Sequence, residues 1–362
     1  MQQRTRFVLV LAGGSGRRFW PLSRDARPKQ LLPLFDGRSL LEMTLQRIEG
    51  MVAPENVLVL TNPLQEPGVR EVCAGLLPAE NILSEPERRD TGPAIALGAG
   101  WVAARDPEGV MAVLPSDHMI RDEAGFRATL EAAFGAAAVL EGLVTIGIEP
   151  TWPSPGFGYI EVGEKVDGVT GAGGHVVRRV RSFREKPAPD VAATFLERGG
   201  FFWNAGMFAW SLPTVRRELA AHAPDLAAYV DVVAAHTGAG ALPAAHAARF
   251  AELGPRSIDY ALLEKSGQTY TLPASFDWDD MGSWPALGGV LPADTEGNRS
   301  NYPVITGKAS SNLVFHTGTK QVALLGVRDL IVVETADAIL VARREDAEEV
   351  KRLCNQVPPE LL

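Results

Sequence analysis

Near its N-terminus the chain carries a glycine-rich turn beside several basic residues. The turn, residues 13–16 with the sequence Gly-Gly-Ser-Gly, follows an apolar run that ends at Leu11, and Arg17, Arg18 and Lys29 come soon after it. Glycines let backbone N–H groups approach a ligand closely. Arginine and lysine side chains bind phosphate oxygens. This combination predicts a site for a nucleoside triphosphate.

Two common nucleotide-binding motifs do not fit this turn. A P-loop requires Lys-Ser or Lys-Thr after its last glycine, but Gly16 is followed by Arg17 and Arg18. The dinucleotide fingerprint requires Gly or Ala three positions after Gly16, where this chain has Phe19. These mismatches argue against a P-loop NTPase and against a dehydrogenase.

Composition narrows the class of protein. The 362 residues are enough for one large domain and a smaller one. A net charge of −9 argues against a nucleic-acid partner and against a membrane surface. The uncharged stretch at about residues 92–104 is too short to span a bilayer. The two cysteines, Cys73 and Cys354, indicate neither a disulfide framework nor a zinc site, so we expect a cytoplasmic protein.

In the first half of the chain, strand patterns alternate with helix patterns. Strands are expected at 7–11, 57–61, 110–114 and 143–148, and helices at 39–49, 93–104 and 123–140, with a further helix at 257–265. Asp90, followed by Thr91, Gly92 and Pro93, is expected to cap a helix start. This alternation predicts a Rossmann-like α/β fold with a mixed, mainly parallel sheet flanked by helices. Ligands of such sheets bind beyond the carboxyl ends of the strands, where the glycine turn lies. The fold would therefore place this turn at the ligand.

After Pro292 the pattern changes to short β runs separated by Gly, Asn and Asp, followed by a charged helix over 344–353. This change predicts a small, β-helix-like C-terminal domain. We expect a large catalytic domain over 1–292 and the small β domain with its terminal helix over 293–362.

Seven segments along the chain resemble one enzyme family. The glycine turn, with the Trp-Pro-Leu-Ser and Pro-Lys-Gln that follow it, resembles the signature of the sugar-1-phosphate nucleotidyltransferases, and in detail their mannose-1-phosphate guanylyltransferase branch. Further matches, in the order of that branch, are Glu-Pro-Glu-Arg-Arg-Asp-Thr-Gly-Pro-Ala-Ile at 85–95, Pro-Ser-Asp-His at 115–118, Glu-Lys-Pro at 185–187, Trp-Asn-Ala-Gly-Met-Phe at 203–208, Ser-Ile-Asp-Tyr at 257–260 and Trp-Asp-Asp-Met-Gly-Ser-Trp at 278–284. The resemblance covers essentially the whole chain and includes the left-handed β-helix-like C-terminal domain.

The resemblance implies an enzyme that transfers GMP from GTP to α-D-mannose 1-phosphate, giving GDP-mannose and pyrophosphate. Such a reaction is an in-line attack on the α-phosphorus, which positioning and charge neutralisation accelerate. Arg18 and Lys29 would be the catalytic cations. Asp117, just after an expected strand, and Asp280 would bind Mg²⁺, which prefers a few carboxylates together with phosphate oxygens and water.

The resemblance also implies two binding sets. The nucleotide-binding residues would be Ala12, Gly13, Gly14, Ser15, Gly16, Arg89, Thr91, Pro93 and Ser116. The sugar-phosphate-binding residues would be Gly158, Glu185, Lys186 and Asn204. Which of Arg89, Asp90 and Thr91 reads the base stays open. The short β module has edges that need covering, and a homodimer is expected.

Two alternatives stay open at this point. One is a nucleotidyltransferase for another nucleotide or hexose 1-phosphate, because Asp90 and Gly92 stand where the branch has Asn and Ala, and Arg17 where it usually has Thr. The other is a non-catalytic regulatory subunit that binds a nucleotide sugar on the same fold. The presence of the whole charged set argues against the second alternative.

Overall fold

A computed structural model describes residues 4–170, 174–236 and 244–362. The chain divides into two compact units, and each draws on segments that are distant in the sequence. The first unit contains Met1–Gly13, Thr44–Ser116 and Ile120–Trp278; the second contains Gly14–Met43, Asp117–Met119 and Asp279–Leu362. The glycine turn is therefore split, because the chain passes from the first unit to the second between Gly13 and Gly14.

The first unit is built on a nine-stranded sheet whose order is β3-β2-β1-β4-β8-β5-β9-β7-β6 among the described residues. Its strands are β1 (Arg6–Leu11), β2 (Val57–Thr61), β3 (Ile82–Ser84), β4 (Val110–Pro115), β5 (Leu143–Ile148), β6 (Tyr159–Thr170), β7 (Val176–Arg184), β8 (Phe201–Ser211) and β9 (Thr269–Pro273). Strands β3, β2, β1 and β4 are parallel, whereas β8 runs antiparallel to both β4 and β5. The expected mixed α/β sheet is confirmed, but the expectation of mainly parallel pairing is wrong, because β6, β7 and β8 pair antiparallel with each of their neighbours in the described sheet.

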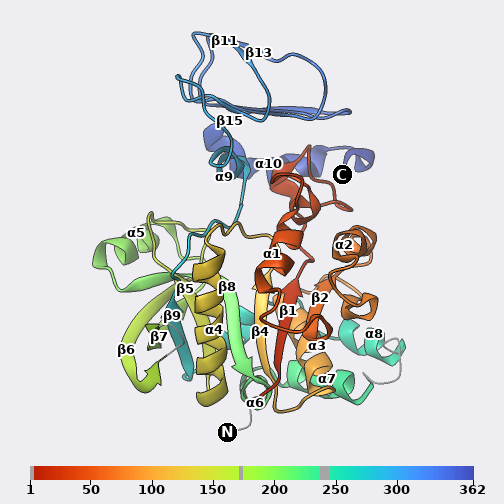
Figure 1. Cartoon of the computed structure of the whole chain (residues 1–362), viewed down its shortest axis with the longest axis vertical. Helices are drawn as coiled ribbons and strands as arrows, with labels where there is room; N and C mark the ends of the chain where they lie inside the picture. Colours follow the sequence, from red (N-terminus) through yellow and green to blue (C-terminus); the bar gives the residue numbers. More distant parts are fainter. Residues whose placement is uncertain (1–3, 171–173, 237–243) are drawn as a thin grey trace. The chain divides into compact units, whose positions relative to one another are not determined.

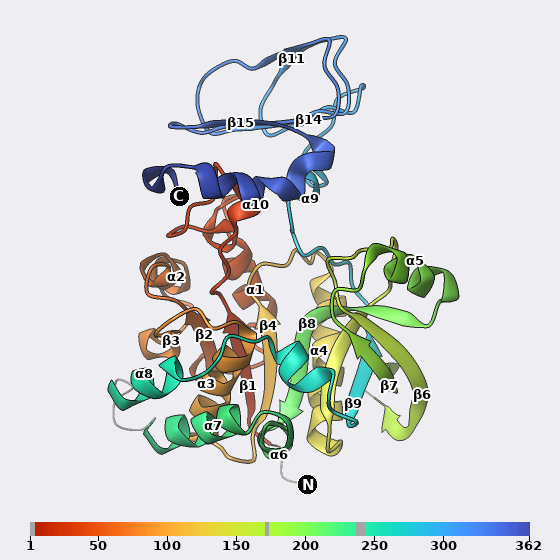
Figure 2. The ribbon, with the colours of Figure 1, turned by 180° about the vertical axis from the view of Figure 1, so that it is seen from behind.

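Helices cover both faces of this sheet (Figures 1 and 2). The helices outside the C-terminal region are α1 (Leu40–Ile48), α2 (Glu66–Cys73), α3 (Thr91–Ala103), α4 (Glu123–Val139), α5 (Pro189–Arg198), α6 (Leu212–His222), α7 (Pro224–His236) and α8 (Ala244–Ala251). Figure 1 shows α4 in front of the sheet, and Figure 2 shows α6 and α7 on the opposite side. No helix in the described part of the chain has the length and apolar character needed to cross a bilayer.

Helix α3 is buried on every side, and its sequence explains why. Asp90 caps its first turn by accepting a hydrogen bond from the Thr91 N–H at 2.7 Å, as the sequence predicts. A Cβ at Gly98 would fall 2.5 Å from Leu9 of β1, and a Cβ at Gly100 would fall 2.4 Å from Val233 of α7. The glycines therefore let α3 pack closely between the sheet and α7.

The second unit contains stacked short strands. They are β10 (Arg299–Ser300), β11 (Ile305–Gly307), β12 (Leu313–His316), β13 (Ala323–Leu325), β14 (Leu330–Glu334) and β15 (Ile339–Arg343). Strands β10, β12 and β14 are parallel neighbours in one sheet with β15 at its edge, and β11 pairs with β13 in parallel. Asn312 stacks on Asn298 at the turns, where its Nδ2 donates to Asn298 Oδ1 at 2.8 Å. These coils confirm the expected β-helix-like module.

An apolar core joins this module to N-terminal residues of the same unit. Phe19, Trp20, Trp284 and Phe315 are all buried in it. The indole of Trp284 donates to the Trp20 carbonyl at 3.1 Å. The predicted terminal helix over 344–353 is a 3₁₀ helix over Arg344–Glu349 that continues as α10 (Val350–Leu353).

Candidate functional site

In the second unit, one buried lysine connects three segments that are distant in the sequence. Lys29 is only 8% exposed. Its Nζ donates hydrogen bonds to the carbonyl oxygens of Asp280 and Met281, each at 2.8 Å, and forms an ion pair with Asp117 Oδ2 at 3.0 Å. We call Lys29, Asp117 and Asp280 the lysine–aspartate cluster. The structure therefore brings together one predicted catalytic cation and both predicted metal ligands.

The glycine turn packs directly against the Lys29 segment. Gly16 has a φ of +59°, and a Cβ there would fall 2.7 Å from the backbone nitrogen of Lys29. The side-chain amide of Gln30 donates to the Gly14 carbonyl at 3.1 Å. Only glycine satisfies both the left-handed conformation and this close approach. Gly16 thus lets the turn lie directly against the start of a short 3₁₀ helix, Lys29–Leu31.

The two aspartates of the cluster have opposite electrostatic environments. Burial acts to raise the pKa of Asp117, but the charges of Lys29 and His118 outweigh it, so the pKa lies below its ordinary value. The pKa of Asp280 is raised, because burial and the negative charges of Asp279 and Asp117 outweigh the effect of Lys29. Asp280 therefore gains most from an additional cation.

The donor set fits a magnesium ion that also takes ligands from a substrate. Within the described residues, no three His, Cys, Asp or Glu side chains group as a metal site. Mg²⁺ usually takes one or two carboxylates and completes its shell with phosphate oxygens and water, so Asp117 and Asp280 suffice. A Cβ at Gly282 would fall 2.9 Å from Asp280 Oδ2, so this glycine leaves room for the carboxylate.

The arginines after the glycine turn are paired with acidic side chains of the same unit. Arg17 binds Asp25 through two hydrogen bonds, at 2.9 and 2.6 Å. Arg18 forms an ion pair with Glu348 at 2.7 Å, in which both side chains are partly exposed. Arg17 thus has a structural partner, whereas the Arg18 pair is accessible to a competing anion.

In the first unit, a buried glutamate lies at the end of β7. Glu185 has an 8% exposed side chain, and its Oε1 pairs with Lys186 Nζ at 3.0 Å. Lys186 has a φ of +43°, a strained conformation that places its backbone directly beside this carboxylate. A Cβ at Gly158 would fall 2.4 Å from Glu185 Oε2. Gly158 is therefore the residue that makes space for the glutamate.

Asn204 of β8 binds a residue that the predicted set of site residues did not include. Asn204 Nδ2 donates to Asp259 Oδ1 at 2.8 Å, and its Oδ1 accepts from the Gly206 N–H at 3.1 Å. Burial and the charge of Glu185 raise the pKa of Asp259 to about 7. Asp259 lies in the Ser-Ile-Asp-Tyr segment and begins a π-helix (Asp259–Leu263), an element frequent at functional sites.

A second unpredicted carboxylate lies near the end of β3. Glu85 is buried, and an added Cβ at Gly13 would lie 3.8 Å from its Oε1. Burial raises the pKa of Glu85 to about 8. Its position in the sequence could have identified it. Glu85 follows the end of β3 directly, and it begins the segment 85–95 that also contains Arg89 and Thr91.

The remaining predicted nucleotide-binding residues of the first unit have structural contacts. Arg89 donates to the Leu253 carbonyl at 2.7 Å, and Thr91 Oγ1 accepts from the Ile258 N–H at 2.9 Å. Ser116 is buried after β4, where its N–H donates to the Leu11 carbonyl at 3.2 Å. Ala12, Pro93 and Ser116 are buried, whereas Gly14, which belongs to the second unit, is exposed.

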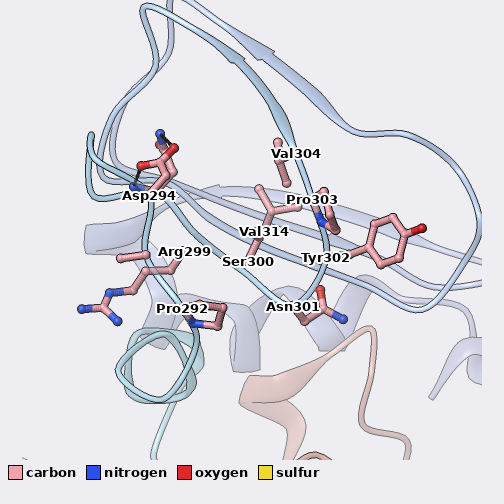
Figure 3. A pocket seen from close by; sticks show the side chains of 11 residues that line it. Pro292, Asp294, Arg299, Ser300, Asn301, Tyr302, Pro303, Val304 and Val314 are labelled. Atoms are coloured by element: carbon pink, nitrogen blue, oxygen red, sulfur yellow. Dashed lines mark hydrogen bonds between the residues drawn. The ribbon is translucent and has the colours of Figure 1, made fainter.

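A separate hollow of about 410 Å³ lies among the β coils of the second unit (Figure 3). Asp294 and Tyr302 line it, but none of the predicted site residues does. Its polar groups bond within the loop: Asn298 Nδ2 donates to Asp294 Oδ2, and Arg299 donates to the Leu291 carbonyl. The hollow therefore offers few unused polar groups to a ligand.

Comparison with protein families gives two matches. A model described as nucleotidyl transferase matches residues 7–297, and one described as MannoseP isomerase/GMP-like beta-helix domain matches residues 309–357. Both the glycine turn and the lysine–aspartate cluster lie inside the first match.

Individual proteins are similar over most of the chain. A mannose-1-phosphate guanylyltransferase of Escherichia coli is 37% identical over 95% of this chain and 72% of its own length. The xanthan biosynthesis protein XanB of Xanthomonas campestris is 36% identical over 96% of this chain and 72% of its own length. A crystal structure of mannose-1-phosphate geranyltransferase from Thermus thermophilus is 32% identical, with a TM-score of 0.85 over 97% of this chain and 99% of that one.

Proposed function

Because the chain belongs to the nucleotidyl transferase family, we propose that it transfers GMP from GTP to α-D-mannose 1-phosphate. An oxygen of the sugar phosphate attacks the α-phosphorus of GTP, the bond to the β-phosphate oxygen breaks, and GDP-mannose and pyrophosphate form. The names of the similar bacterial proteins support the choice of substrates. The observation that carries the proposal is the lysine–aspartate cluster packed against the glycine turn.

In this reaction the cluster acts on the triphosphate. Asp117 and Asp280 would hold Mg²⁺, which would supply positive charge to neutralise the phosphates. Lys29 keeps the two aspartate segments in register through its two carbonyl hydrogen bonds and its ion pair. Arg18 exchanges Glu348 for the pyrophosphate oxygens, on which negative charge develops as the bond breaks. The attacking phosphate is already ionised at neutral pH, so His118 need not act as a base.

The sugar-phosphate end uses the first unit. Lys186, whose side chain is 62% exposed, is available to the phosphate of the hexose. Glu185 accepts hydrogen bonds from ring hydroxyls, and Gly158 lets the backbone approach the ring. Asn204 is engaged through both its amide nitrogen and its amide oxygen, so its part is to position its neighbours.

Base selection is assigned to Glu85. A carboxylate accepts both from the N1–H and from the 2-amino group of guanine, and adenine lacks that pair of donors. We predict that Glu85→Gln reduces the preference for GTP over ATP about 10–100-fold, because an NH₂ donor replaces one of the two oxygens that face the guanine donors. Steady-state kinetics with both nucleotides measure this ratio, and an unchanged ratio would remove Glu85 from base recognition.

The proposal includes a cytoplasmic homodimer. Cys73 and Cys354 are buried free thiols, which suits a reducing compartment. Ile339 and Val341 are 60% and 62% exposed on the edge strand β15, where apolar side chains favour a covering partner. Light scattering of the purified protein gives the oligomeric state.

One substrate panel tests the proposed reaction. Purified protein is incubated with each of the four nucleoside triphosphates and several hexose 1-phosphates, with Mg²⁺ or with EDTA, and products are identified by mass. We expect GDP-mannose and pyrophosphate with GTP and mannose 1-phosphate, and only with the metal. Formation of a different nucleotide sugar would change the proposed substrates but would leave the enzyme a nucleotidyltransferase. Binding without turnover for every pair would indicate a regulatory subunit instead.

A further inference from the structure

Asp259 is a buried carboxylate that the proposed transfer of GMP does not yet use. It starts the π-helix Asp259–Leu263, and its Oδ1 accepts the Asn204 hydrogen bond at 2.8 Å. Asn204 is itself fixed by the Gly206 N–H, so the amide nitrogen must face Asp259. A π-helical turn and an oriented amide together hold this carboxylate in one place.

Near Asp259 lies Glu185, one of whose carboxylate oxygens has no hydrogen-bond partner among the described residues. Glu185 Oε2 is buried and makes no hydrogen bond within the described residues, and the missing Cβ of Gly158 leaves the space that this oxygen occupies. An unpaired buried acceptor costs free energy, so it is retained where a ligand completes it. The charge of Glu185 adds to burial in raising the pKa of Asp259, so the two carboxyl groups lie near each other.

We infer that Asp259 and Glu185 together bind the hydroxyl groups of the hexose ring, and that Asp259 determines which hexose 1-phosphate is accepted. This inference rests on the proposed function and assigns the selectivity of the same site to a residue outside the predicted set. Asn204 is then a positioning residue, which aims Asp259 at the sugar.

The charge balance identifies the kind of ligand group. Glu185 and Asp259 both lie near Lys186, whose Nζ pairs with Glu185 Oε1 at 3.0 Å. A further carboxylate, that of Glu264, accepts from the Glu185 N–H at 3.0 Å. A second anion would be repelled from the carboxylates, so the substrate's phosphate belongs with Lys186. The carboxylates are therefore suited to accept hydrogen bonds from uncharged donors. A sugar ring supplies several hydroxyl donors, and their arrangement differs between epimers. A site that bonds a hydroxyl rejects the analogue that lacks it or misplaces it.

The test compares Asp259→Asn with the wild type. Asparagine keeps an oxygen that can accept from Asn204, so the local fold is conserved while the charge is lost. Asp231→Asn is the matched control, because Asp231 is an exposed helix residue paired with Arg216 in the same unit. The readouts are kcat and KM for GTP and for mannose, glucose and galactose 1-phosphates, and calorimetric binding of mannose 1-phosphate alone.

We expect Asp259→Asn to raise KM and Kd for mannose 1-phosphate about 10–100-fold, as for loss of a charged hydrogen-bond acceptor, with KM for GTP unchanged. The preference for mannose over its epimers should shrink about tenfold. The control should match the wild type. Asp259→Glu, which keeps the charge but moves it by one methylene, should also weaken sugar binding and serves if the asparagine variant does not fold.

Each contrary result has its own meaning. Equal sugar affinity in Asp259→Asn and the wild type overturns the inference while the wild-type turnover still supports the proposed function. An equal rise in KM for GTP and for the sugar also overturns it, because it indicates general disruption. If the wild type neither binds nor uses any hexose 1-phosphate, the inference and the proposed function both fail.

Discussion

The lysine–aspartate cluster and the Glu185–Asp259 pair both combine a lysine with two carboxyl groups, but they shift the pKa of an aspartate in opposite directions. In the lysine–aspartate cluster a buried cation makes three contacts and holds the pKa of Asp117 below its ordinary value. In the Glu185–Asp259 pair the lysine is mostly exposed, and the pKa of Asp259 rises to about 7. On the proposed function, the first arrangement would keep a carboxylate ionised for a cation, and the second would provide acceptors for the neutral hydroxyl donors of the sugar.

Both clusters share one backbone feature. Met281 follows Asp280 with a φ of +48°, and Lys186 follows Glu185 with a φ of +43°. A non-glycine residue in the left-handed region costs about 1–3 kcal/mol and persists where surrounding contacts demand it. Lys29 donates a hydrogen bond to the Met281 carbonyl, and this contact stabilises the strained conformation of Met281.

The largest effect is expected for Asp280→Asn in the lysine–aspartate cluster. Loss of this carboxylate should lower kcat about 10³-fold or more, because the charge that neutralises the triphosphate loses a ligand. Asp346→Asn, an exposed aspartate of the same unit, is the control. Turnover with titrated Mg²⁺ and circular dichroism measure activity and fold. Near-normal turnover would exclude Asp280 from the metal site.

Lys29→Met should come next. The variant removes two carbonyl hydrogen bonds and leaves Asp117 without its cation, so we expect a loss of stability of about 3–5 kcal/mol together with a kcat lower by about 10²-fold. Urea unfolding and single-turnover kinetics separate these effects. A stable variant with an unchanged chemical rate would mean that Lys29 neither positions the aspartates nor acts on phosphate.

The sequence was sufficient for much of the framework, for identifiable physical reasons. Strands β2 and β5 and the cap at Asp90 agree with the pattern, because apolar runs and N-cap chemistry are local signals. The nucleotidyltransferase fold with its C-terminal β-helix-like domain also agrees with the matched family models. Strand β9 was missed, since its five residues, which pair with β5 and β7, carry little periodicity of their own.

The contacts within the site could not be predicted in the same way. Lys29 bonds a carbonyl 251 residues away, and no local pattern encodes that distance. The segment 257–265 was predicted as a helix, but its π-helical turn at Asp259 depends on tertiary packing. Glu85 and Asp259 differ from other acidic residues only by burial and neighbours, which the sequence alone does not contain.

The Glu185–Asp259 pair predicts an unusual dependence of stability on pH. The folded pKa of Asp259, about 7, lies above the unfolded value of about 3.9, so the native state binds more protons between these values. The free energy of unfolding therefore falls as pH rises through this window. Asp259→Asn removes the titration, and we expect the variant to gain on the order of 1–3 kcal/mol relative to the wild type between pH 4 and pH 8.

Urea unfolding at several pH values measures this difference. If Asp259 had a purely structural role, its substitution would lower the free energy of unfolding at every pH. A gain in this free energy above pH 7 therefore indicates a carboxylate that binds a ligand at a cost in stability. A constant difference between variant and wild type across the window would show that Asp259 is not strained by burial. The expected sign is opposite for Asp117, whose pKa is lowered.

The smallest effect is expected at the margin of the lysine–aspartate cluster. Glu348→Gln removes the partner of Arg18, an exposed ion pair of a kind that contributes about 0.2–1 kcal/mol, so the melting temperature should barely change. Because Glu348 competes with the triphosphate for Arg18, its loss should lower KM for GTP by about two- to fivefold with kcat unchanged. Glu349→Gln, whose partner is Arg352, is the matched control. A higher KM for GTP in Glu348→Gln would mean that the glutamate orients Arg18 for the nucleotide rather than competing with it.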